Sequence, residues 1–154
     1  MAILNYALAT LITFSGIFVG FILALVAKEE LEPGKGYFIL LQNLIFSLII
    51  FFLLYFNDLS IWLAIIMALL TFIFLLKSKI NPLAIYLSLA LIFNAGFRNR
   101  LSVFILIASL ILIYGIPTGS LLTYKLKNKK LKTLKNIIIK YGIFVPIAIV
   151  LFFL

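Results

Sequence analysis

The sequence predicts an all-α integral membrane protein, a bundle of about six transmembrane helices joined by short loops. Of its 154 residues, 66% are hydrophobic and only 11% are charged, whereas a soluble domain carries about 25% charged residues. The hydrophobic residues form six runs, most of them long enough to cross a hydrocarbon core of roughly 30 Å as a helix. Apart from Lys140, the charged residues lie between these runs, where water and lipid headgroups can solvate them.

The apolar runs define the helices that we expect. They lie at about 3–27, 37–56, 59–76, 80–97, 101–116 and 136–154, with a basic loop at 123–135. The fourth run barely spans a membrane, so the fourth and fifth helices could instead form a re-entrant pair. No connecting segment is long enough to build a core of its own, which predicts a single transmembrane domain over 1–154.

The first helix carries a stripe of small residues. They recur at spacings of three and four, which places them on one helix face: Ala9, Thr13, Gly16, Gly20 and Ala24. A Gly-x-x-x-Gly pair lets another helix backbone approach closely. We expect this face to pack against a helix of the same chain, and the alternative is a homo-oligomer or a partner membrane subunit.

A charged segment follows the first helix. Glu29, Glu30 and Glu32 lie in it, and Pro33-Gly34 suits the two central positions of a type II turn. The simpler interpretation of the glutamates is a solvated loop, because surface carboxylates are common. A cation or substrate site at the membrane face is the alternative.

The fifth run ends in a segment that could interrupt a helix. Pro117 cannot donate a backbone hydrogen bond, so this segment is either a helix end or a break. An exposed backbone beside lysines is a way to bind an anionic headgroup or substrate in a membrane. The candidate residues are Gly115, Pro117, Thr118, Gly119, Ser120, Lys125 and Lys129. The alternative is a solvated basic loop that only fixes the topology. In the last run, Pro146 is expected to kink the helix.

The positive charges predict how the chain is threaded. With six crossings, the first, third and fifth loops share one side and carry eleven lysines, whereas the second and fourth carry only Arg98 and Arg100. Cytoplasmic loops are enriched in Lys and Arg. We therefore expect a protein of the cell membrane with both termini outside and the lysine-rich loop in the cytoplasm, in contact with anionic lipid headgroups.

Several chemistries are disfavoured by what the sequence lacks. There is no cysteine and no histidine, which removes thiolate chemistry, the usual proton shuttle and the commonest transition-metal ligand. Every Asp, Glu and Arg lies at a predicted loop or helix end. We therefore predict no catalytic residues, no metal and no cofactor, and we read the positive charge as a membrane signal and not as nucleic-acid binding.

Three functions remain open. The first is a non-catalytic membrane subunit or scaffold that packs through its first helix. The second is a small transporter or channel for a small or lipid-like substrate, and the third is a membrane enzyme acting on lipid or phospho-substrates. The abundance of Ile, Lys and Phe suggests an AT-rich prokaryotic coding sequence.

Overall fold

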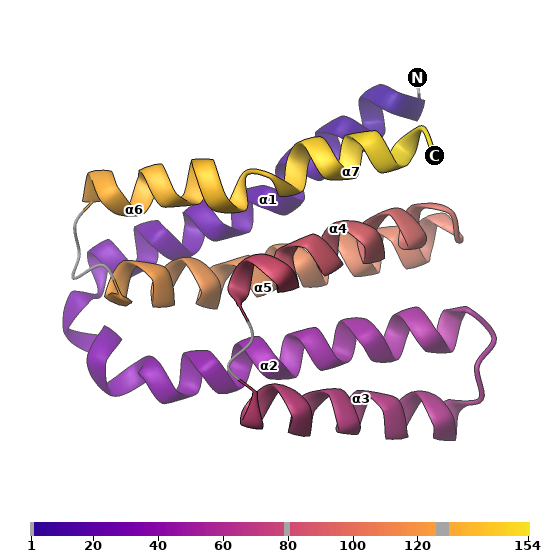
Figure 1. The fold of residues 1–154 in the computed structure, drawn as a ribbon, viewed down its shortest axis with the longest axis horizontal. Coiled ribbons are helices and arrows are strands. Elements are labelled where there is room, and N and C mark those ends of the chain that lie inside the picture. Colours follow the sequence, from indigo (N-terminus) through magenta and orange to yellow (C-terminus); the bar gives the residue numbers. More distant parts are fainter. Residues whose placement is uncertain (1, 79–80, 126–129) are drawn as a thin grey trace.

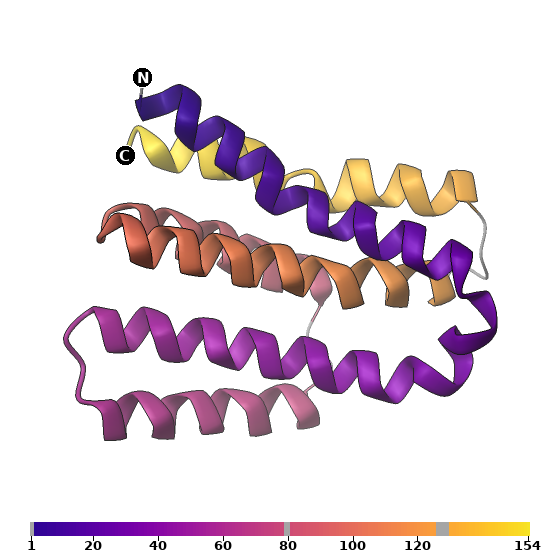
Figure 2. The ribbon, with the colours of Figure 1, turned by 180° about the vertical axis from the view of Figure 1, so that it is seen from behind.

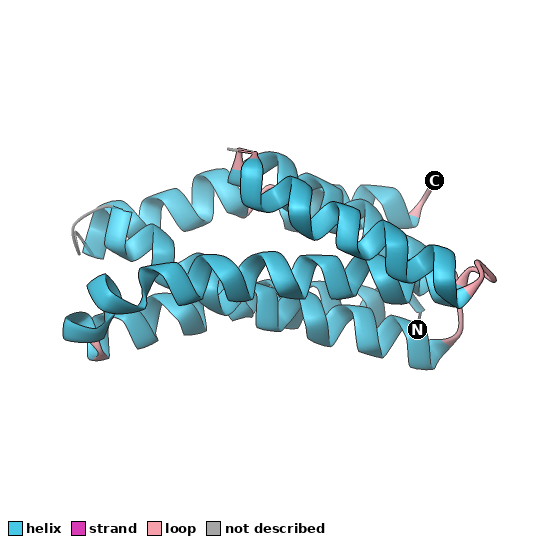
Figure 3. Ribbon diagram, turned by 90° about the horizontal axis from the view of Figure 1, so that it is seen from below, coloured by secondary structure: helices cyan, strands magenta, loops and turns pink. Residues whose placement is uncertain are grey.

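The computed structural model describes residues 2–78, 81–125 and 130–154, and these ranges are helical throughout apart from short turns (Figure 3). The helices are α1 (Ala2–Val26), α2 (Leu31–Phe56), α3 (Ile61–Lys77), α4 (Pro82–Phe97), α5 (Leu101–Lys125), α6 (Lys130–Asn136) and α7 (Phe144–Phe152). A 3-10 helix, Lys28–Glu30, precedes α2, and a π-helix, Ile137–Tyr141, follows α6. No strand occurs within the described ranges, which confirms the predicted all-helical class.

Helices α1 to α5 run alternately in opposite directions, and α6 and α7 follow one another in the same direction back to the turn end, which gives the bundle two distinct ends (Figure 1). One end, called here the lysine end, holds the junction of α1 and α2, the last turn of α5 and the start of α6. The other, called the turn end, holds both termini and the turns between α2 and α3 and between α4 and α5. The described lysines lie toward the lysine end, and Arg98 and Arg100 lie in a turn of the turn end.

The helices differ in length in a way that shapes the bundle. Four helical segments are long and apolar enough to cross a membrane: Ile3–Val26, Lys28–Phe56, Leu101–Lys125 and Leu131–Phe152. Helices α3 and α4 have only 17 and 16 residues, or about 25 Å of helix, against roughly 37 Å for the 25 residues of α5. Both reach the turn end and stop well short of the lysine end (Figure 1).

The backbones of helices α1 and α5 come into close contact, and each helix places glycines at that contact (Figure 2). A Cβ built on Gly16 would lie 2.8 Å from the carbonyl carbon of Leu112, and one on Gly115 would lie 2.6 Å from the backbone nitrogen of Ile17. Gly20 and Gly119 repeat this arrangement one turn further along, so the two backbones approach through reciprocal glycine pairs.

The rest of the predicted stripe lies inside the bundle as well. Thr13 and Ala24 are buried and Ala9 packs against the core. The Ser120 hydroxyl donates a hydrogen bond to the Gly20 carbonyl at 3.0 Å, which ties α5 to α1 beside the glycines. At Gly16 and Gly20 the small-residue face is therefore covered by α5 of the same chain.

An aromatic cluster fills the bundle toward the turn end. The Phe93 ring is fully buried and lies 5.2 Å from Tyr6, 5.0 Å from Phe104 and 5.9 Å from Phe144, centroid to centroid. The Tyr6 hydroxyl donates to the Ala148 carbonyl at 3.0 Å. These contacts join α1, α4, α5 and α7 through aromatic side chains.

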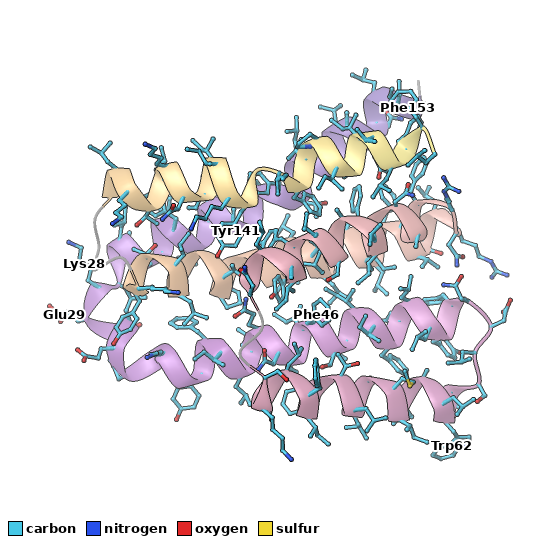
Figure 4. All side chains as sticks on the ribbon, viewed as in Figure 1. Lys28, Glu29, Phe46, Trp62, Tyr141 and Phe153 are labelled. Carbon is cyan, nitrogen blue, oxygen red and sulfur yellow. The ribbon has the colours of Figure 1, made fainter. Side chains whose placement is uncertain are left out.

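Burial is inverted relative to a water-soluble protein. Thr10, Thr118 and Ser120 are buried, while Trp62 is 74% exposed and most of the large apolar side chains of α3 are exposed. Figure 4 shows Phe46 between helices and Trp62 on the outer edge of α3. In hydrocarbon the outer surface of a bundle is apolar, and small and polar residues collect between the helices. This pattern agrees with the helix lengths in pointing to a membrane.

The first turn differs from the sequence prediction, whereas the last helical run is interrupted near Pro146 as the sequence predicts. Pro33 and Gly34 lie in the first turn of α2, and the chain reverses at Ala27–Glu30 instead. Pro33 is tolerated there because the first backbone N–H groups of a helix have no partner within the helix. In the last run the turn falls at Gly142 and Ile143, so that Pro146 lies in the first turn of α7.

The predicted end of the fifth helix near residue 116 is wrong. Helix α5 continues through Pro117 to Lys125 without interruption, and the basic segment is helical again from Lys130. Proline within a membrane helix is tolerated because neighbouring helices and polar side chains satisfy the freed backbone groups. The predicted exposure of backbone groups at a break after Tyr114 is therefore not observed.

Candidate functional site: a polar cavity at the lysine end

A cavity of about 260 Å³ lies in the half of the bundle nearest the lysine end. Four segments line it: α2, the start of α4, the last turns of α5, and the stretch from α6 into the π-helix. The lining residues are Gln42, Asn81, Leu83, Thr118, Leu121, Leu122, Lys125, Asn136, Lys140 and Tyr141. Most of these side chains are polar or charged, in a chain that is otherwise strongly apolar.

The cavity exists because α4 is short. Asn81 caps α4 by accepting a hydrogen bond from the Leu83 N–H at 3.0 Å, and Pro82 occupies the first helical position. These are the residue types that start a helix. Because α4 starts here, α2, α5 and α6 extend past it toward the lysine end (Figure 1). The start of α4 thus forms part of the cavity floor, and helix N-termini favour negative charge.

Three side chains at the base of the cavity form a connected network. The Gln42 Nε2 group donates to the Tyr114 hydroxyl and to Thr118 Oγ1, both at 2.9 Å. The Thr118 hydroxyl in turn donates to the Tyr114 carbonyl at 2.9 Å. Since the single Thr118 proton is used in this bond, Thr118 must accept from Gln42. The network therefore joins α2 to α5 at the base of the cavity.

A layer of tyrosines closes the cavity on the side of the turn end. The Tyr86 ring lies 5.9 Å from Tyr114 and 5.1 Å from Tyr141, centroid to centroid. Tyr86 and Tyr114 are almost completely buried, and Figure 4 shows Tyr141 directed into the bundle. The aromatic cluster around Phe93 follows beyond this layer. Within the described residues, the polar lining thus ends near the middle of the bundle.

Two lysines provide positive charge at the mouth. Lys125 comes from the last turn of α5 and Lys140 from the π-helix, and both line the cavity while remaining exposed. The rise of an α-helix places Thr118 about 10 Å below Lys125 along α5. The cavity therefore runs from a cationic mouth to a base of neutral hydrogen-bonding groups.

Only some of the residues that the sequence suggested for an anion site line the cavity. Thr118 and Lys125 line the cavity. Gly115, Gly119 and Ser120 contact α1, Pro117 is buried, and Lys129 lies outside the described residues. The remaining polar lining residues were not assigned to a site from the sequence. Gln42 and Lys140 could have been identified from the sequence, since each is a polar residue inside an apolar run.

The three loop glutamates lie on the surface of the described chain. Glu29, Glu30 and Glu32 are all exposed, and Figure 4 shows Glu29 pointing outward at the lysine end beside Lys28. Within the part of the chain that the structure describes, no three acidic, histidine or cysteine side chains are grouped as metal ligands would be.

Comparison of this chain with protein-family models, with curated proteins and with solved structures gives no match.

Proposed function

We propose that this chain is a multi-pass membrane protein that binds an anionic group in the cavity at its lysine end, without catalysing a reaction on it. The observation that supports this most directly is the pairing of Lys125 and Lys140 at the mouth of a cavity with a neutral polar base. Ligand sites are concave and hold a few convergent polar groups. Two ammonium groups beside amide and hydroxyl groups match a phosphate or carboxylate.

The placement in a membrane rests on the apolar outer surface and on the uneven distribution of positive charges between the two ends. The long helices and the exposed apolar faces suit a hydrocarbon environment. The described lysines lie toward the lysine end and the two arginines lie at the turn end, and positive charge favours the cytoplasmic side. The cavity then opens at the cytoplasmic face of the cell membrane, and both termini lie outside.

The other functions considered have less support. A subunit that docks through the first helix would need the face that α5 already covers. A channel would need a polar path through the tyrosine layer and the aromatic cluster. An enzyme using the loop glutamates would need them to converge, whereas they point into solvent. Binding needs only the groups that the cavity already brings together.

Replacing both cavity lysines with alanine should weaken the binding of an anionic lipid roughly 30-fold, because each lysine near an anionic group contributes about 1 kcal/mol. The matched control is Lys132→Ala with Lys135→Ala. Both control residues are exposed at the same end and outside the cavity lining, so this pair removes the same net charge.

The measurement is the apparent Kd for phosphatidylethanol, a singly charged phosphodiester lipid, by native mass spectrometry of the detergent-solubilised protein. The control pair should keep most of the affinity. An equal loss in both pairs would mean that the lysines act only as a diffuse positive surface, and the proposed site would be rejected.

A further inference from the structure

We infer that the preferred ligand of the cavity is a membrane lipid whose headgroup combines a phosphodiester with hydroxyl groups, as a glycerol phosphate headgroup does. This inference rests on the proposed function, because it names the chemical class that the same cavity selects. It follows from the hydrogen bonds at the base, from the donors on the wall, and from the side on which α4 stops short of the lysine end.

The base of the cavity presents a hydrogen-bond acceptor. Both bonds that fix the Gln42 amide use its nitrogen, toward the Tyr114 hydroxyl and Thr118 Oγ1. In this arrangement the Thr118 hydroxyl donates to the Tyr114 carbonyl and accepts from the Gln42 nitrogen. Gln42 lines the cavity, so its carbonyl oxygen is the part of the amide left for a ligand. An amide oxygen accepts hydrogen bonds only, and a ligand hydroxyl can supply one.

The wall and the mouth present donors. The Asn81 oxygen is used to cap α4, which leaves its NH₂ group as the part that can face the cavity. Lys125 and Lys140 carry the positive charge further out. A phosphodiester near the mouth would satisfy these donors, and hydroxyls extending inward from it would reach the acceptor at the base. A phosphate bearing only an alkyl group would leave the Gln42 oxygen without a partner, which costs free energy in a partly buried site.

The shape of the cavity favours a lipid over a soluble phosphate ester. Because α4 begins at Pro82, it does not extend as far toward the lysine end as α2 and α5 do (Figure 1). The cavity is partly open to the outside of the bundle, and we place its opening on this side. Leu83, Leu121 and Leu122 line it together with the polar groups, and apolar side chains suit the glycerol and acyl carbons of a lipid. A headgroup can thus enter sideways while its acyl chains stay in the bilayer.

The experiment compares two lipids with the same charge and the same acyl chains, phosphatidylglycerol and phosphatidylethanol, which differ in the headgroup hydroxyls. The unaltered protein should bind phosphatidylglycerol about fivefold more tightly, the value of one hydrogen bond of ordinary strength. Gln42→Met keeps the volume of the side chain and removes its acceptor. This variant should bind the two lipids equally, and it is the ratio of the two affinities that tests the inference.

Gln42→Asn is the second variant, in case methionine disturbs the network with Tyr114 and Thr118. It keeps an amide but withdraws the oxygen by one methylene, and it should also lose the preference. Thermal unfolding of each variant is measured in parallel, and only variants that unfold within a few degrees of the unaltered protein are compared. A third arm adds soluble glycerol 3-phosphate as a competitor, which should displace the lipid only weakly.

The outcomes separate this inference from the proposed function. Equal binding of both lipids by the unaltered protein, or a preference that survives in both Gln42 variants, would overturn the hydroxyl selectivity and leave the anion site standing. Strong displacement by glycerol 3-phosphate would overturn the assignment to a lipid. If removing Lys125 and Lys140 has no more effect than the control pair, the site itself fails.

Discussion

Replacing Gly20 with alanine should destabilise the bundle by about 3 kcal/mol, the upper part of the range for adding a methyl group to a packed interior. The added Cβ would lie 2.8 Å from the carbonyl carbon of Ile116. That neighbour is backbone within the unbroken helix α5, so no side chain can rotate away to make room. The two helices would have to separate, and the hydrogen bond from Ser120 to the Gly20 carbonyl would be strained as well.

Gly36→Ala is the matched control for this substitution. Gly36 is also within a helix, but a Cβ there would meet no atom within 4 Å. Alanine should stabilise α2 at this position by several tenths of a kcal/mol through its higher helix propensity. Thermal unfolding in detergent measures both variants, and size-exclusion chromatography reports whether they stay monodisperse. Similar stability of the two variants would contradict the reciprocal glycine contact between α1 and α5.

Phe93→Ala should have the second largest effect, a loss of about 2 kcal/mol. Truncating a buried phenylalanine in a soluble protein costs roughly 3–5 kcal/mol. Part of that cost is transfer from water, and this part largely vanishes when the unfolded helices stay in lipid. What remains is the cavity and the lost ring contacts with Tyr6, Phe104 and Phe144.

Phe74→Ala provides the comparison, since Phe74 is 59% exposed on α3. It should change the free energy of unfolding by less than about 0.5 kcal/mol, as surface substitutions usually do. The measurement is unfolding in a lipid bilayer or bicelle. If Phe74→Ala costs as much as Phe93→Ala, α3 packs against a further surface and does not face acyl chains.

The sequence predicted the helical class because the apolar runs are long and the charges lie between them. The stripe on α1 was also identifiable, since Gly16 and Gly20 have the spacing that close helix contacts use. Its counterpart, Gly115 and Gly119, has the same spacing but was interpreted as a helix break because Pro117 lies between them. Whether a proline ends a membrane helix depends on the neighbouring helices, and a sequence does not contain that information locally.

The cavity could not be predicted because four segments far apart in the chain supply it. Thr118 and Lys125 were identified from their local pattern, but Gln42 lies 76 positions before its partner Thr118. The space itself results from a difference in helix length, because α4 begins at Pro82 while α2 and α5 extend further toward the lysine end. The short fourth helix was visible in the sequence, but the continuation of α5 past residue 116 to Lys125 was not.

Labelling of single cysteines tests the central claim, that the chain lies in the membrane with its lysine end and cavity on the cytoplasmic side. The chain contains no cysteine, so each introduced thiol is the only one. Ser60→Cys lies at the turn end before α3, Lys132→Cys lies on α6 at the lysine end, and both positions are exposed. We predict that a membrane-impermeant maleimide labels Ser60→Cys on intact cells and labels Lys132→Cys only after the membrane is permeabilised. Labelling of Lys132→Cys on intact cells, with Ser60→Cys protected, would contradict the threading and remove the cavity from the cytoplasmic leaflet.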